Sequence, residues 1–319
     1  MHRKEVSSIL LHGGIMSFHL KSDAIRVTIE LPGEHYRGSR FDWNGTATEF
    51  SYRNIPLLGE EKPLFKRNRR IFGRGLHNEF GIKDCIGYDD CNTGEFFPKI
   101  GTGWLKKDDK PYFFYTQYEM EQLKFEHEKR GPDSASFKCF SGERNGYAYE
   151  YEKTFTVDSS SLTIDYYLEN TGDKPLSTTE YSHNFFCPGR KPLDNKNSLL
   201  FSWFFNEHYV QNKESAGGFT AFDGQNETGG TLYFTRKPSN EFFLSGLYAA
   251  KTKNKDENEN FSWTLRDSQK QVQISEIVSF IPSACDVWGH KNCISPELFL
   301  KFSIEKGDCL RWQRKYRLQ

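Results

Sequence analysis

Hydrophobic and polar residues alternate along much of this chain. The alternation runs over residues 24–31 and again over residues 147–155, where aromatic side chains alternate with polar ones. A period of two places the apolar side chains on one face of an extended strand. Both segments are therefore predicted to be strands with one buried face.

Further segments repeat this pattern and are separated by short clusters of turn-forming residues. Residues 161–168 form a third predicted strand, and the Asn, Gly and Pro residues that follow it favour a turn. The other predicted strands cover residues 230–234, 261–265, 271–280, 298–304 and 310–318.

Helical patterns are scarce. No long stretch combines helix caps with an apolar stripe of period 3.6, and the best helical candidate, residues 120–129, is charged nearly all round. The sequence therefore predicts an all-β fold in which large antiparallel sheets pack face to face. Because no linker interrupts the pattern, we expect one domain over residues 17–319, preceded by an N-terminal extension of residues 1–16.

Charge and composition narrow the classes of partner. The 43 Lys and Arg residues are balanced by 43 Asp and Glu residues, which disfavours nucleic acid as the main partner. The 28 Phe, 16 Tyr and 6 Trp residues argue against disorder. No apolar run is long enough for a membrane-spanning helix, and the short apolar run at residues 8–11 does not make a signal peptide. We expect a cytoplasmic protein that binds neither nucleic acid nor membrane.

The cysteines give no sign of a disulfide framework or a zinc site. There are 7 of them, an odd number, and none stands in a Cys-x-x-Cys pair. Buried free thiols are the simpler interpretation.

Residues 36–45 are the first of four segments that place polar catalytic residue types beside glycines and aromatics. If this segment is an extended strand, Arg37 lies on one face with Phe41 and Trp43, while Arg40 and Asp42 share the other face and could pair. An ion pair beside an aromatic stripe at a sheet edge and a ligand contact are both compatible with this pattern.

The second segment, residues 73–82, leads through a loop into residues 96–105. Its glycines allow the backbone to approach a ligand closely or simply to turn. His77 is either a hydrogen-bonded structural imidazole or a catalytic group. The glycine spacing does not make a phosphate loop, because no Gly-Lys-Ser/Thr sequence follows.

The third and fourth segments carry a histidine and a glutamate. Over residues 178–186, alternation places His183 between two aromatic residues on one face and Glu180 on the other face, so His183 is a candidate proton donor. Over residues 286–300, Glu297 follows Pro296 at the start of an apolar strand, where burial would raise its pKa toward that of a general base. Trp43, Trp104 or Trp288 could offer its apolar ring face to a ligand.

These four segments, in this order, resemble the galactose mutarotase-like superfamily, which includes the aldose 1-epimerases. The most specific parts are Tyr-x-His-Asn-Phe-Phe at residues 181–186, Ser-Pro-Glu at residues 295–297 and the spaced Gly-Asp, Trp and Tyr of residues 307–316. Residues 36–43 look like one poorly characterised bacterial branch. The resemblance covers nearly the whole chain from about residue 17 and implies a β-supersandwich.

The resemblance also implies a mechanism. His183 would protonate the ring oxygen of a sugar, and Glu297 would take the proton from the anomeric hydroxyl. Opening a hemiacetal needs one acid and one base, and it requires neither a metal nor an organic cofactor. The implied partner is a monosaccharide or oligosaccharide, and the chain would act as a monomer or homodimer.

The chain departs from the superfamily pattern at two positions. Better-known members carry a second His followed by Gly, where this chain reads Lys99-Ile100-Gly101, so either Lys99 or His77 takes that place. An expected substrate-binding Asp is matched only weakly, by Asp223. Together with Arg37 and Arg74, Lys99 would form a cationic lining suited to an acidic sugar.

Three functions follow from the sequence. The leading hypothesis is an aldose 1-epimerase-type enzyme that uses Glu297 and His183. The alternative is a non-catalytic carbohydrate-binding protein on the same fold. The third is a glycoside hydrolase or polysaccharide lyase accessory module, which is disfavoured because hydrolysis ordinarily needs two carboxylates about 5–9.5 Å apart. Only Glu297 is well placed, since Glu180 is predicted to face away from His183.

Overall fold

The computed structural model describes residues 17–62, 68, 70–218, 220–226, 229–248, 261–267, 269 and 272–319, without the side chains of residues 224–226. The N-terminal extension expected for residues 1–16 lies outside this range. Within the described part of the chain, no helix is long and apolar enough to cross a membrane.

The described residues are almost entirely β-structure. The strands are β1 (Phe18–Lys21), β2 (Ile25–Glu30), β3 (Thr46–Tyr52), β4 (Ile55–Pro56), β5 (Leu76–Phe80), β6 (Phe96–Lys99), β7 (Gly103–Lys106), β8 (Met120–Gln122), β9 (Lys124–Lys129), β10 (Ser134–Phe140), β11 (Tyr149–Val157), β12 (Ser161–Asn170), β13 (Leu176–Asn184), β14 (Asn197–Phe201), β15 (Thr220–Asn226), β16 (Gly229–Phe234), β17 (Phe242–Leu244), β18 (Phe261–Asp267), β19 (Gln273–Val278), β20 (Ala284–His290), β21 (Cys293–Ile304) and β22 (Cys309–Leu318). Three short 3-10 helices cover Pro188–Arg190 (η2), Glu207–Tyr209 (η3) and Lys213–Ala216 (η4).

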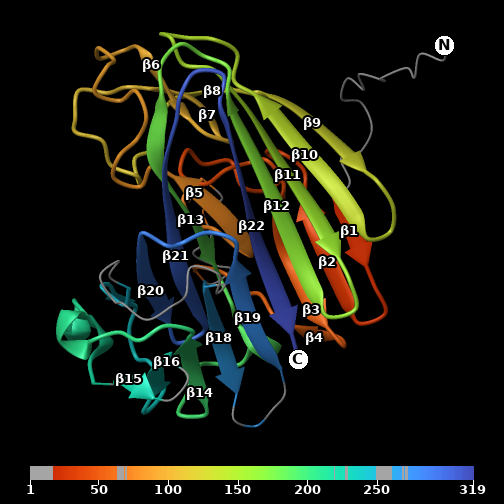
Figure 1. Ribbon diagram of the computed structural model, residues 1–319, viewed down its shortest axis with the longest axis vertical. Coiled ribbons are helices and arrows are strands. Elements are labelled where there is room, and N and C mark those ends of the chain that lie inside the picture. Colours follow the sequence, from red (N-terminus) through yellow and green to blue (C-terminus); the bar gives the residue numbers. More distant parts are fainter. Residues whose placement is uncertain are drawn as a thin grey trace.

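Two large antiparallel sheets make up most of the molecule. The first has the order β1-β2-β3-β5-β13-β21-β20-β17, with β4 paired to β3, and the second has the order β15-β16-β14-β18-β19-β22-β12-β11-β10-β9. In Figure 1 the strands β9 to β12 lie in front of β1 to β3, so the two sheets stack as layers. Strands β6, β7 and β8 form a third, small sheet. The predicted all-β sandwich is confirmed.

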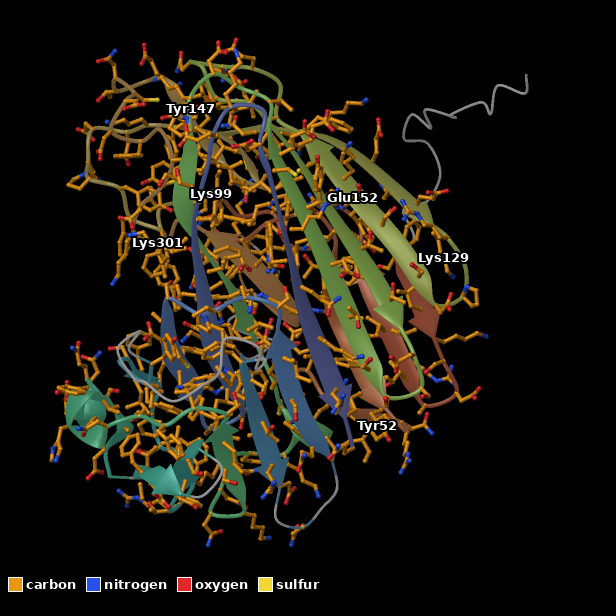
Figure 2. The ribbon with its side chains drawn as sticks, viewed as in Figure 1. Tyr52, Lys99, Lys129, Tyr147, Glu152 and Lys301 are labelled. Carbon is orange, nitrogen blue, oxygen red and sulfur yellow. The ribbon has the colours of Figure 1, made fainter. Side chains whose placement is uncertain are left out.

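Side chains from both large sheets fill the space between them (Figure 2). Charged residues in this layer are paired. Lys153 lies 3.0 Å from Asp42, and Arg314 lies 2.7 Å from Glu180 and 3.0 Å from Glu276. A buried charge without a partner would cost several kcal/mol, so these pairs constrain how the sheets stack. Glu180 therefore points into this layer, away from the face that carries His183, as the alternation predicts.

Residues 120–129, the best helical candidate, form the strands β8 and β9 instead. One local expectation is wrong. Residues 36–45 are not a strand, because the Tyr36 hydroxyl accepts the backbone N–H groups of Arg40 and Phe41 and folds the segment back on itself. The expected Arg40–Asp42 pair does not form, since Arg40 pairs with Glu79 and Asp42 pairs with Lys153.

Candidate active site

Four titratable side chains occupy matching positions on four adjacent strands of the first sheet. His77 on β5 lies opposite His183 on β13, and Asp286 on β20 lies opposite Glu297 on β21. Strands β13 and β21 keep one register from the Tyr181–Phe299 pair to the Phe186–Ile294 bridge, which places His183 opposite Glu297. Directly opposite residues share a face of the sheet. We call His77, His183, Glu297 and Asp286 the site row.

His183 and Glu297 are in direct contact at the centre of this row. The His183 Nε2 lies 3.5 Å from Glu297 Oε1, and the two side chains are only 5% and 4% exposed. The imidazole stacks on Phe185 at 4.7 Å and meets the edge of Trp288 at 5.1 Å. The two groups that the sequence predicts to be catalytic therefore meet inside an apolar cluster.

Burial shifts the two pKa values in opposite directions. The pKa of Glu297 is well above its ordinary value, mainly because of desolvation and then because of the Asp286 carboxylate, while Arg40 and a hydrogen bond from Ser295 oppose the shift. The pKa of His183 is well below its ordinary value because of burial and the charge of Arg40. Burial therefore favours the uncharged form of each group, a protonated carboxyl on Glu297 and a neutral imidazole on His183.

His77 is the neighbour of His183 on the other side. It stacks on Phe41 at 4.6 Å, and its Nε2 accepts the backbone N–H of Arg74 at 3.2 Å. Burial lowers the pKa of His77 to about 3. His77 is therefore neutral, and its remaining hydrogen is on Nδ1.

A second set of charged residues surrounds Glu79, which lies two residues after His77 on β5. Glu79 lies opposite Tyr181 and accepts hydrogen bonds from that hydroxyl and, at 2.8 Å, from Arg40 Nε. Lys99 approaches Glu79 Oε1 to 3.8 Å and donates to the Tyr112 hydroxyl at 2.8 Å. Figure 2 shows Lys99 at the level of β5 in the upper half of the sandwich. Lys99 is on β6 of the small third sheet, whereas His77 is on β5, which pairs with β13. His77, and not Lys99, is therefore the direct neighbour of His183.

Several polar atoms around the site row are buried without a hydrogen-bond partner among the described residues. They are Arg40 Nη1, His77 Nδ1, Glu79 Oε1, His183 Nδ1 and Glu297 Oε1. Buried polar atoms are normally hydrogen-bonded, so a concentration of exceptions in one place needs an explanation. This mixture of donors and acceptors suits a ligand that carries several hydroxyl groups.

An aromatic loop between β7 and β8 packs on Arg40 beside the site row. The Arg40 guanidinium lies 4.7 Å from the ring centre of Phe114 and 4.8 Å from that of Tyr115, and the Tyr115 hydroxyl donates to Glu61 at 3.2 Å. The neighbouring cavity, which His77 and Arg74 help to line, measures about 20 Å³. Such a volume holds about one water molecule. With both catalytic candidates buried, the site is closed in this conformation.

The expected cationic lining does not form. Arg37 is exposed and donates to the backbone oxygen of Gly33, while Arg74 is 30% exposed and lies 3.6 Å from Glu30. Lys99 is buried, and its positive charge lies 3.8 Å from the negative charge of Glu79. The three cations therefore contact three different groups, the backbone of Gly33, Glu30 and Glu79. The argument for an acidic sugar therefore loses its structural basis.

Other predicted residues lie partly at the site. Trp288 packs on His183 and donates its indole N–H to Glu241 at 3.1 Å. Trp104 instead belongs to the main core, where it donates to the backbone oxygen of Ser141. Asp223 lies in β15 at the edge of the second sheet, so it does not supply the expected aspartate.

Asp286, Arg40 and Glu79 were not identified from the sequence as site residues. For Asp286 a signal was available: β20 and β21 are joined by the two-residue turn Lys291-Asn292, and a two-residue hairpin loop fixes the register. Counting back from that turn places Asp286 opposite Glu297. For Arg40 and Glu79 no local pattern existed, because their pairing depends on tertiary structure.

Metal ligands are not gathered at the site. Over the ranges that the structure describes, no group of three or more His, Cys, Asp or Glu side chains could hold a metal ion.

Comparison with known proteins identifies the architecture. No protein-family model matches the chain, and no curated protein matches it. Among solved structures, the Synechocystis protein Slr1438 superposes with a TM-score of 0.60 at 14% identity, over 100% of this chain and 99% of that one. An aldose epimerase homologue from C. elegans superposes with a TM-score of 0.58 at 12% identity, over 95% and 99% of the two chains. A galactose mutarotase-like protein from Lactobacillus casei gives 0.56 at 11% identity, over 95% and 100%.

This is the galactose mutarotase-like fold. The supersandwich expected from the sequence is confirmed over nearly the full length of the chain. Within the galactose mutarotase-like fold of this protein, the site row crosses the middle of the first sheet, where β13 has β5 on one side and β21 on the other.

Proposed function

We propose that this chain is a cofactor-independent aldose 1-epimerase-type enzyme, which interconverts the anomers of a sugar with His183 and Glu297 as its acid–base pair. The observation that carries the proposal is the cross-strand contact of 3.5 Å between His183 Nε2 and Glu297 Oε1. The fold supports it, since structures described as an aldose epimerase homologue and as galactose mutarotase-like share this architecture.

The spacing of the pair suits a hemiacetal. The anomeric hydroxyl and the ring oxygen of a sugar are bonded to the same carbon, so the acid and the base that act on them must lie close together. His183 Nε2 accepts the proton of the anomeric hydroxyl while the Glu297 carboxyl donates its proton to the ring oxygen. The ring opens, the first carbon rotates, and the reverse transfers close the ring and restore both side chains. Each group contributes about 10²- to 10⁴-fold to the rate.

The reactive state of the pair holds one titrating proton. Burial favours the arrangement with this proton on Glu297 and a neutral His183. The opposite arrangement, with ionised Glu297 and protonated His183, has the same proton count and therefore the same pH dependence. The rate should fall at low pH as His183 becomes protonated, and at high pH as Glu297 loses its proton.

Substrate access requires the aromatic loop to open. Phe114 and Tyr115 stack near Arg40, whose charge acts on both members of the pair. Opening would admit a sugar to the unpartnered polar atoms of Arg40, Glu79 and His77. Because Glu79 and Glu61 together offset the charges of Arg40 and Lys99, we expect neutral sugars to be better substrates than acidic ones.

The test is exchange between anomers measured by NMR, with a panel of neutral and acidic aldoses. We expect exchange above the spontaneous rate, and a loss of at least about 100-fold in Glu297→Gln and in His183→Asn. Glu305→Gln, at an exposed position just after β21, is the matched control and should retain full activity. Spontaneous rates for every sugar, with folded protein, would contradict the proposal.

The closed site favours one rival, a carbohydrate-binding protein without turnover. The two catalytic candidates are 5% and 4% exposed and touch each other. Under this rival, sugars would perturb the NMR signals of the site while the anomers exchange at the spontaneous rate, and Glu297→Gln would bind as well as the parent protein.

A further inference from the structure

Two cysteines face each other just beyond the strand that carries His183: Cys187 follows the end of β13, and Cys293 begins β21. Phe186 and Ile294 exchange both backbone hydrogen bonds at 3.0 Å and form an isolated bridge in the register of β13 and β21. The next residue beyond this bridge on each side is a cysteine, so Cys187 lies opposite Cys293. Because pairs alternate along an antiparallel ladder, this pair is of the non-hydrogen-bonded type, in which side chains are closer.

The two side chains point to the same face. Phe186 and Ile294 belong to the main core, whereas Cys187 and Cys293 both belong to the cluster that contains Phe185. A Cβ atom built on Gly59 would lie 2.9 Å from Cys187 Cβ and 3.7 Å from Cys293 Cβ, so the two cysteines flank one point. Non-hydrogen-bonded pairs have a Cα separation of about 4.5 Å, within the range of about 4.4–6.8 Å found in disulfides.

A hydrogen-bond donor stands beside one of the thiols. The Cys293 Sγ lies 3.0 Å from the Nε2 of His290, across the tight turn that joins β20 to β21. Burial lowers the pKa of His290, so the imidazole is neutral, and because its Nδ1 accepts the backbone N–H of Asn292 at 3.1 Å, its hydrogen is on Nε2. This N–H can donate to the Cys293 sulfur and stabilise the thiolate that thiol–disulfide exchange requires.

We propose that Cys187 and Cys293 are an intramolecular dithiol that oxidises to a cross-strand disulfide, with the His290 Nε2–H as the hydrogen-bond donor that stabilises the Cys293 thiolate. The oxidant is a small disulfide, RSSR. The Cys187 sulfur attacks one sulfur of RSSR, which gives a mixed disulfide and releases one RSH. The Cys293 thiol loses its proton to solvent, and its sulfur then attacks the Cys187 sulfur and expels RS⁻, which takes up a proton from solvent. In total, two protein thiols and RSSR give one protein disulfide and two RSH.

Burial makes this reaction slow and selective. Cys187 is 5% exposed and Cys293 is 0% exposed, and burial raises the pKa of Cys187 to about 11. Oxidation should therefore take minutes to hours, and the disulfide, once formed, should be shielded from reductants. The exposed Cys309 reacts first, but it begins β22, beyond the far end of the 12-residue strand β21 from Cys293, so it gives only adducts or intermolecular bonds. This inference does not depend on the proposed function.

The experiment treats the full chain, in a Cys309→Ser background, with 2-hydroxyethyl disulfide. We expect a non-reducing peptide map to show one cross-linked species that joins the Cys187 and Cys293 peptides. The oxidised protein should also melt about 5–10 °C higher, because the bond closes a long loop in the unfolded chain. In Cys293→Ser the mixed disulfide on Cys187 should accumulate, and in His290→Asn it should resolve about 10-fold more slowly than in the parent.

The matched control is Cys285→Ser, which removes a different buried thiol and should leave the cross-link intact. Three results would overturn the inference: a Cys187 adduct in the parent that persists as in Cys293→Ser, a Cys187 thiol that stays unmodified after a day, or a cross-link that joins other cysteines.

Discussion

Glu297→Gln should stabilise the folded protein at neutral pH while it removes activity. The folded-state pKa of Glu297 lies well above its ordinary value of 4.5, and the main cause is desolvation. Below pH 4.5 the carboxyl is protonated in both the folded and the unfolded chain, so the shift then has no effect on stability. As the pH rises above 4.5, only the unfolded chain ionises, and the folded state loses stability relative to it. Glutamine has a similar shape and never ionises, so the variant escapes this loss.

The size of the effect follows from linkage. Each pH unit between the unfolded and the folded pKa costs about 1.4 kcal/mol. The unfolding free energy of Glu297→Gln minus that of the parent should thus rise with pH above 4.5, with a limiting slope of about 1.4 kcal/mol per pH unit, until the folded pKa is reached.

Urea unfolding at several pH values measures this difference. A constant offset between the two proteins would reflect only packing and hydrogen bonding, so the slope with pH is the informative quantity. Glu305→Gln, which removes an exposed carboxyl, should show almost no slope. A difference that is flat between pH 5 and 7, or that falls as the pH rises, would refute the reasoning about Glu297.

Other substitutions test the neighbours of the pair. Asp286→Asn removes a negative charge about one cross-strand spacing from Glu297, so the high-pH limb of the rate profile should move down by about 1 pH unit. Ser295→Ala removes a hydrogen bond that lowers the pKa of Glu297, so this limb should move up, and Ser295→Thr should restore it. Tyr115→Phe deletes the hydrogen bond to Glu61 in the closed loop, so the apparent KM should fall about 3- to 10-fold; an unchanged KM would contradict loop opening.

The strands were predictable because their pattern is local. Alternation located β2, β11, β12 and β22 to within a few residues, and it placed His183 and Glu180 on opposite faces of β13. Glu297 was found because Pro296 and the following apolar run mark a buried strand.

The rest of the site depends on information that a linear pattern does not contain. Arg40 belongs to an irregular segment whose path is set by the Tyr36 hydroxyl, so alternation along that segment was misleading. The neighbour of His183 was also undetermined, because the partner of β13 is β5, whose sequence lies about 100 residues earlier. The closing loop contains aromatic residues without strand or helix periodicity, so nothing in the sequence predicted that it covers Arg40.

The constant register of β13 and β21 makes the site sensitive to chain length in a way that no single substitution reproduces. Inserting one residue between Tyr181 and His183 would turn His183 toward the layer of Arg314 and turn Ser182 outward. Inserting two residues would restore the faces but leave His183 opposite Ser295, where a hydroxyl replaces the carboxyl. Related proteins that keep this chemistry should therefore vary in length at their loops and conserve the number of residues within these two strands.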